Sequence, residues 1–309
     1  MKHFVFSQKN RFLFIITSVM CLNSSWAQTE IPAGTDKASY FKVAGNFLTN
    51  SVYYGRKDSL PTPYLTASAG YYDKGGFFIS GSLSYLFGKN ATRIDYAALD
   101  LGYNFTVTER FSGSVYGNKG WYNPSSTNIS SDIKGSIGSL LSYDLTALQI
   151  NAGMDVTFAT KTDIGFNLGL SRNFTFGQEG NQFSMEPSFS TNWSSLHSYE
   201  GYITRKLGKR NQTGLPVGVT ATAVTTVQNN KITLLDYELW IPFIYETKKI
   251  GFMFTPTLAI PKNPIYTTTT ITTRQNNVIQ NSLTTNSTPQ SEISLSSNFY
   301  AEFEIFIKF

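Results

Sequence analysis

The chain has 309 residues, of which 15% are charged and 15% aromatic, and its 25 basic and 20 acidic residues give a net charge of +5. Ordinary soluble domains carry about 25% charged residues. Three basic residues, Lys2, Lys9 and Arg11, lie at the N-terminus, so the rest of the chain is close to neutral and gives no reason to expect a nucleic-acid partner. Beyond the N-terminus no run approaches the roughly 18 consecutive apolar residues that a membrane-spanning helix needs, which excludes a helical membrane protein.

The first 27 residues have the features of a cleaved secretory signal peptide. A basic start precedes the apolar run 12–22, and the small residues Ser25 and Ala27 fit the rule for cleavage before Gln28. Cys21 suggests a lipoprotein signal as an alternative, but Met20 before it is not the small residue that such processing requires. The rest of the chain has no cysteine, so we expect no disulfide despite export.

Alternation of apolar with small polar residues is the main pattern from residue 46 onward. In "ALQINAGMDVTF" (147–158) one face carries Leu148, Ile150, Ala152, Met154, Val156 and Phe158, and the other carries Gln149, Asn151, Gly153, Asp155 and Thr157. Side chains on a strand alternate with a period of two, so this pattern predicts strands. Their length matches the roughly 9–11 residues with which a tilted strand crosses a bilayer.

About twelve such strands are predicted, which indicates an all-β fold, a transmembrane antiparallel up-and-down β-barrel. The predicted strands are 46–54, 64–72, 77–87, 94–107, 110–122, 133–145, 147–159, 163–176, 183–204, 231–245, 250–261 and 291–309. Residues 1–27 are then the signal peptide, 28–45 an N-terminal lead-in (a disordered or periplasmic segment, a girdle or a plug), and 46–309 the barrel. Pro187, Pro242 and Pro256 are expected at bulges or at the rim. A secreted lectin-like sandwich is the alternative fold.

An even number of strands places both chain ends on one side, which we expect to be the periplasm. The longest connections, 205–230 and 262–290, then lie on the outer side. For the Thr-rich segment 265–273, "IYTTTTITT", an extended hairpin and a disordered loop are both compatible with the sequence.

The C-terminal segment "FYAEFEIFIKF" (299–309) resembles the C-terminal signal of bacterial outer-membrane proteins, and Phe303, Ile305, Ile307 and Phe309 carry this resemblance. It implies an outer-membrane location, contact with outer-membrane lipid and a barrel-assembly machinery as partner. The segments 235–264 and "VYYGR" (52–56) resemble uncharacterised barrel proteins of Bacteroidetes-type bacteria. None of these resemblances implies an activity.

Catalysis and metal binding have little support in the sequence. Some outer-membrane barrels of this size are lipid hydrolases, and Ser195 shares a predicted strand face with His197, the one histidine after the signal peptide. Known phospholipase barrels have the serine two residues after the histidine, where this chain has Tyr199. We therefore expect no enzyme, and we expect no metal and no cofactor.

The remaining function classes are a channel and a plugged barrel. We expect a porin-like channel passing small hydrophilic solutes; the alternatives are a plugged structural or surface-interaction barrel with binding loops, and a barrel lipid hydrolase. On strand 231–245 the set Leu235, Tyr237, Leu239, Ile241 and Phe243 is predicted to face outward, which turns Asp236 and Glu238 inward.

Glu302 and Glu304 are likewise predicted to face the lumen. With one strand between the two acidic pairs, we expect them about 10 Å apart at similar height, where they would attract cations. Alternatively Lys134, Lys308 or another inward cation pairs with them.

Overall fold

A computed structural model describes residues 38–57, 61–88, 91–126, 128–178, 180–212, 219–227, 231–275, 278–287 and 296–309. It also describes one short antiparallel pair, β1 (Ile15–Ile16) with β2 (Glu30–Ile31). The rest of the expected signal peptide, with Cys21 and its cleavage site, and most of the expected lead-in lie outside the described residues. Among the described helices, none is both long and apolar enough to span a membrane.

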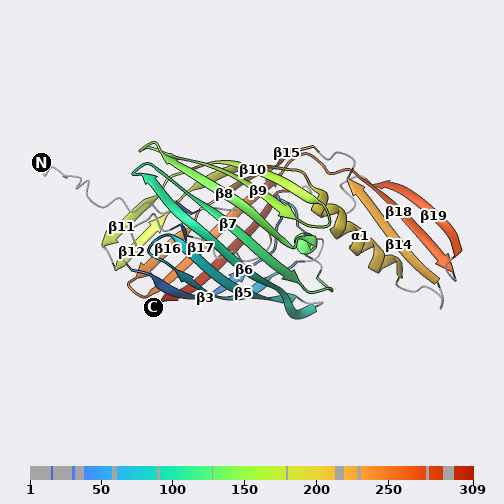
Figure 1. The fold of residues 1–309 in the computed structure, drawn as a ribbon, viewed down its shortest axis with the longest axis horizontal. Helices are drawn as coiled ribbons and strands as arrows, with labels where there is room; N and C mark the ends of the chain where they lie inside the picture. Colours follow the sequence, from blue (N-terminus) through green and yellow to red (C-terminus); the bar gives the residue numbers. More distant parts are fainter. Residues whose placement is uncertain are drawn as a thin grey trace, which may run out of the picture.

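Twelve antiparallel strands of the described chain close into a barrel (Figure 1), as the sequence predicted. They are β3 (Tyr40–Leu48), β4 (Tyr64–Tyr72), β5 (Phe77–Gly88), β6 (Ala91–Thr108), β7 (Phe111–Tyr122), β8 (Gly135–Asp144), β9 (Gln149–Phe158), β10 (Thr162–Ser171) continued by β11 (Phe174–Gln178), β12 (Asn181–Met185) continued by β13 (Ser188–Ser194), β15 (Thr233–Trp240) continued by β16 (Phe243–Thr247), β17 (Ile250–Pro261) and β20 (Asn298–Lys308). The last strand closes the ring by pairing with β17 on one side and β3 on the other.

Three predicted strands have wrong bounds, and the last of them, 291–309, begins at Asn298. The first covers Tyr40–Leu48 rather than 46–54, because Lys42, which the sequence analysis placed in the lead-in 28–45, is an inward residue of β3. The predicted strand 183–204 ends at Ser194, since a helix, α1 (His197–Gln212), begins three residues later. The loop predicted at 205–230 therefore includes the second half of this helix and another strand, β14 (Val219–Val227).

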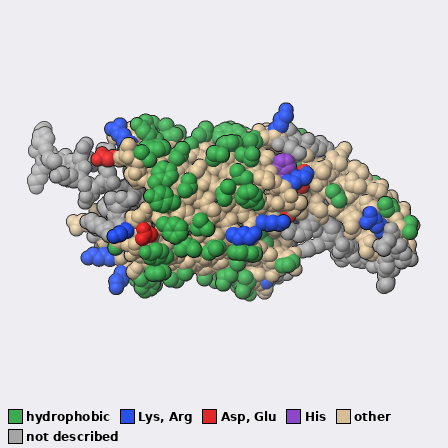
Figure 2. Space-filling model, in the orientation of Figure 1, with side chains coloured by type: hydrophobic (Ala, Val, Ile, Leu, Met, Phe, Trp, Pro, Cys, Tyr) green, Lys and Arg blue, Asp and Glu red, His purple; other side chains and the backbone are tan. Residues whose placement is uncertain are grey.

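The barrel is apolar outside and polar inside. Phe303, Ile305, Ile307 and Phe309 all face outward, with 39–74% of their surfaces exposed. Large hydrophobic side chains cover much of the visible barrel wall in Figure 2. Because lipid rather than water can accommodate such a belt around a closed ladder, the chain has the fold of an outer-membrane β-barrel.

Three barrel strands, β10–β11, β12–β13 and β15–β16, are interrupted at neighbouring positions, and prolines lie at or beside these interruptions. The backbone N–H groups of Arg172, Glu186 and Ile241 donate to the carbonyls of Pro187, Pro242 and Pro256, each at 3.2 Å, so the ladder continues across the breaks. Pro187 and Pro242 lie at interruptions across which the register of the ladder does not change, so the prediction of bulges was wrong for them. Pro256 lies within β17, at neither a bulge nor the rim, so the prediction for it was wrong.

The ladder explains why β17 tolerates a proline. Pro256 lies opposite Ala301, whose backbone N–H and C=O both bond to Thr49, on the side away from β17. The missing N–H of Pro256 therefore removes a bond only on the Ile241 side.

Both ends of the barrel chain lie at the same rim, where the backbones of Phe41 and Phe309 exchange two hydrogen bonds of 3.2 and 2.9 Å. Short turns join the strands at this rim, and the long connections lie at the opposite one (Figure 1). There β14, β18 (Thr267–Gln275) and β19 (Val278–Ser287) form a separate antiparallel sheet that projects beyond the barrel. Of the two interpretations of the Thr-rich segment, the extended hairpin is the one observed.

Candidate functional site

Small polar side chains line much of the barrel interior, together with large buried ones such as Phe78 and Phe306. Several buried atoms of the polar side chains have no hydrogen-bond partner within the described protein, and they belong to six strands: Asn104 Oδ1, Ser112 Oγ, Ser136 Oγ, Ser190 Oγ, Asp236 Oδ2 and Thr255 Oγ1. Other inward residues, among them Ser68, Ser80, Ser82 and Asn151, are only half-buried. The half-buried polar residues keep accessible surface inside the barrel, which indicates space for water there.

The four predicted acidic residues face inward, but they do not lie at one height. The strand between them is β17, as expected; on it, Glu238 lies opposite Ala259 and Glu302 lies opposite Thr255. These positions are four residues apart, roughly 13 Å along the strand. The hairpin fixes this offset, because it pairs Glu246 with Gly251 and so moves Asp236 and Glu238 toward the long-loop rim.

Leu235, predicted to face outward, is 1% exposed. The pairing of β13 with β15 shifts register between Asn192 and Trp193, which leaves Leu235 without a direct partner. Such a bulge locally reverses the alternation of side chains. Leu235 therefore packs into the barrel mouth.

Each acidic pair has its own partners. Lys42 Nζ lies 2.8 Å from Glu304 Oε1, and the Asn46 side-chain amide donates to Glu302. Asn192 donates to Asp236 at 2.8 Å. Lys42, rather than Lys134 or Lys308, is thus the lysine that pairs with one of the four predicted carboxylates, Glu304. Lys134 is exposed, and Lys308 pairs with Glu246 at 2.6 Å.

An apolar cluster lies at the rim that carries the long connections. It joins the connection 49–63, the 3₁₀ helix η1 (Ile129–Asp132), α1, the end of β14 and the start of β15. Its buried members are Tyr53, Tyr54, Ile129, Ile133, Leu196, Tyr199, Tyr202, Ile203, Val227, Leu235 and Ile265. We call this set the mouth cluster.

The turn Tyr53–Arg56, which we call the finger, carries two tyrosines of the mouth cluster. Tyr53 and Arg56 form a β-bridge with two backbone hydrogen bonds, and Tyr54 and Gly55 between them have φ of 48° and 71°. Positive φ at both central residues defines a tight hairpin turn. Sequence reasoning missed it, since residues 52–54 were assigned to the end of the predicted strand 46–54 and "VYYGR" was otherwise noted only as a resemblance. A Tyr-Gly pair before arginine is compatible with such a turn.

Asp163 on β10 organises the start of α1. Its carboxylate accepts hydrogen bonds from the backbone N–H groups of His197 and Ser198, at 2.6 and 2.7 Å. It also accepts one from Ser195 Oγ at 2.8 Å and lies 2.9 Å from His197 Nδ1. Carboxylates stabilise helix N-termini in this way. Ser195 and His197 are thus brought together around a helix cap, with the serine hydroxyl directed at Asp163 rather than at the histidine.

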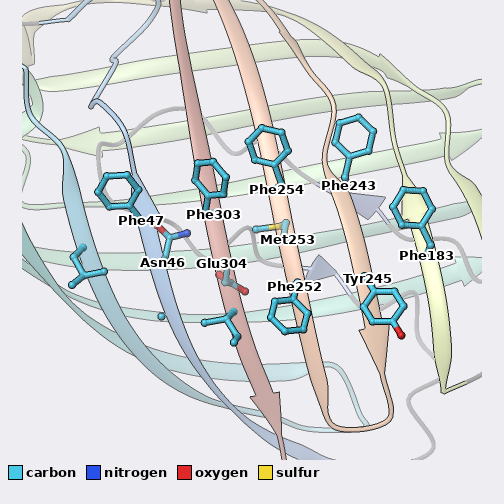
Figure 3. Close-up of a pocket in the computed structure, with 13 residues that line it drawn as sticks. Asn46, Phe47, Phe183, Phe243, Tyr245, Phe252, Met253, Phe254, Phe303 and Glu304 are labelled. Carbon is cyan, nitrogen blue, oxygen red and sulfur yellow. The ribbon is translucent and has the colours of Figure 1, made fainter.

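Aromatic side chains form a groove on the outer wall (Figure 3). Phe47, Phe303, Phe254 and Phe243 lie side by side on four adjacent strands. Ring centroids are 4.7 Å apart for Phe254 and Phe303 and 6.3 Å apart for Phe243 and Phe254. Because these rings point away from the interior, the groove belongs to the lipid-facing wall rather than to a passage through the barrel.

Comparisons with known proteins give only distant similarities. No protein-family model and no curated protein matches the chain. It is similar to CdiB from Acinetobacter baumannii, with 9% identity and a TM-score of 0.34 over 88% of this chain and 60% of that one, so it spans about 60% of CdiB. It is also similar to the outer membrane channel DcaP of Acinetobacter baumannii (10% identity, TM-score 0.32, 89% of this chain and 99% of that one). A third similar structure is OmpF of Salmonella typhi (8% identity, TM-score 0.28, 88% and 97%). Matches this distant carry no argument about function.

Proposed function

We propose that this chain is an outer-membrane channel for small hydrophilic solutes. The observation that carries the proposal is the set of inward polar residues that keep accessible surface inside the barrel, such as Ser68, Ser80, Ser82 and Asn151. A barrel interior packed for stability alone would bury these side chains. Water along the interior would solvate them and would also provide a path for solutes.

The interior charge favours cations. Asp100, Asp155, Asp236, Glu238 and Glu304 are all buried on the inner wall. Lys42 is paired with Glu304, and Lys308 is paired with Glu246. Acidic walls concentrate cations in a hydrated pore. Because the two acidic pairs lie at different heights, cations would be attracted at two levels of the barrel.

We also propose that both chain ends face the periplasm and that the projecting sheet faces outward. The support is the asymmetry of the connections, short at the rim of Phe41 and Phe309 and long at the other, as in bacterial barrels. The C-terminal face with Phe309 supports recognition by a barrel-assembly machinery.

Planar-bilayer recordings test the channel directly. We expect discrete conductance steps and a reversal potential that indicates cation preference in a salt gradient. Neutralising Asp236 and Glu238 together, as Asp236→Asn and Glu238→Gln, should reduce that preference, whereas Glu109→Gln in an exposed turn should leave it unchanged. The absence of steps from correctly folded protein would reject the channel.

A plugged surface-interaction barrel is the second candidate, because the mouth cluster lies at the rim from which the sheet β14–β18–β19 projects. This reading predicts folded protein without conductance in the wild type and in every variant of the mouth. We propose no enzymatic activity, with support from the cap geometry around Asp163.

A further inference from the structure

We propose that the finger, Tyr53–Arg56, is the constriction that limits the size of solutes, and that Arg56 is the residue that positions it. This inference rests on the proposed channel function. It concerns a connection between strands, so the wall of the barrel does not require it: β3 and β4, which it joins, pair with each other over their full lengths.

The tip of the finger fits against the inner wall with no spare room. A Cβ on Gly55 would lie 2.9 Å from Pro261 N and 3.1 Å from Asp236 Cβ. Asn298 on β20 donates to the Gly55 carbonyl at 2.7 Å. The finger therefore contacts β15, β17 and β20 at once, and it lies directly beside Asp236 of the acidic wall.

Arg56 holds this position through backbone carbonyls. Its guanidinium donates to Tyr54 O (2.6 Å), Leu235 O (3.3 Å), Lys262 O (2.6 Å) and Asn263 O (3.0 Å). Burial lowers the pKa of Arg56 to about 10, and nearby Asp236 opposes this shift, so the side chain stays charged at neutral pH. Arginine's fixed fork of donors suits such a set of acceptors better than lysine's single ammonium group.

The two tyrosines extend the finger toward the opposite wall. The Tyr54 side chain hydrogen-bonds Ser194 on β13. Tyr53 Oη lies 3.4 Å from Ser198 Oγ at the start of α1. Contacts thus run from β20 and β17 on one side to β13 on the other. A finger held across the interior in this way would narrow the path of a solute.

The conformation of the finger depends on these contacts. Tyr54 has φ of 48°, in a region that bulky residues seldom occupy and that costs of the order of 1–3 kcal/mol. Arg56 supplies four of the hydrogen bonds that hold this strained turn, so the turn is expected to leave its place when the arginine is removed. The ladder of twelve strands would remain complete.

The test compares Arg56→Ala with Arg93→Ala, a control that removes another arginine near the same rim, where Arg93 pairs with Asp95 at 2.7 Å. Liposome swelling with sugars of increasing size gives the size limit. Arg56→Ala should admit larger sugars, while Arg56→Lys should lie between it and the wild type and Arg93→Ala should match the wild type. An unchanged size limit in Arg56→Ala overturns the proposal.

A second measurement does not depend on conduction. Asn167→Cys places a thiol on the inner wall of β10, four residues farther from the mouth than Asp163. A bulky thiol reagent should label it at least about tenfold faster when Arg56→Ala is added, since hydrogen bonds to a charged group contribute roughly 1.5–3 kcal/mol. Equal rates with and without Arg56→Ala overturn the finger as a barrier. If Arg56→Ala speeds labelling but neither the wild type nor the variant conducts, the finger is a barrier and the proposed channel function is rejected.

Discussion

Gly251 lies directly opposite Phe306 in the ladder of β17 and β20, and a Cβ on Gly251 would lie 2.0 Å from Phe306 Cζ. The ring of Phe306, 1% exposed, covers the glycine inside the barrel, and Lys42 Nζ lies 4.3 Å from its centre. Phe78 on β5 covers Gly102 on β6 in the same way. The Gly251–Phe306 pair fixes the closing strands β17 and β20 to each other, and the Phe78–Gly102 pair fixes β5 to β6.

Replacing Gly251 with alanine should therefore destabilise the barrel, by about 1–3 kcal/mol, because the ring has to leave its place. Gly45→Ala is the matched control, since a Cβ there meets nothing nearer than 3.9 Å. The temperature at which the folded band is lost on SDS gels measures the effect. A Gly251→Ala variant as heat-resistant as Gly45→Ala would show that this contact contributes nothing.

Deleting Phe309 should impair assembly in the membrane. The residue is 74% exposed on the outer face, and its backbone forms two hydrogen bonds with Phe41 that close the barrel at the rim. Membrane yield of the folded protein is the measurement, with Phe309→Tyr as the control that keeps an aromatic ring and both backbone bonds. Full yield of the shortened chain would argue against a C-terminal assembly signal.

Replacing Asp163 with alanine should loosen the start of α1 by about 1–2 kcal/mol, because two backbone N–H groups and Ser195 lose their acceptor. Hydrogen exchange of the backbone amides of residues 197–203 reports this directly. Asp73→Ala, in a turn at the opposite rim, should leave that exchange unchanged. If the amides of residues 197–203 exchange at the same rate in both variants, the Asp163 cap does not stabilise the start of α1.

Replacing His197 with alanine should leave any lipid hydrolysis by the purified protein at its background level. Ser195 Oγ donates to Asp163, so the serine and histidine do not have the arrangement of a nucleophile and its base. Esterase and deacylase assays on wild type and variant measure this. A robust activity that disappears in the variant would contradict the non-enzymatic assignment.

The sequence by itself determined the barrel. Alternation along segments such as 147–158 predicts strands that are apolar on one face only, and the lengths and even number of the strands leave a closed transmembrane ladder as the consistent solution. The inward direction of Glu302 and Glu304 follows from the same period of two, and the outward face ending in Phe309 follows with it.

Only the tertiary structure decided how the interior is arranged. The height of Glu238 relative to Glu302 depends on hairpin register, the inward turn of Leu235 on a bulge, and the start of α1 on Asp163, a residue on another strand. The finger is held by carbonyls of residues as far along the chain as Leu235 and Lys262. The alternation of residues along a strand indicates which side chains face the lumen and which face the lipid. Register, bulges and inserted turns depend on contacts with residues far away in the chain, and a local sequence pattern carries no information about those contacts.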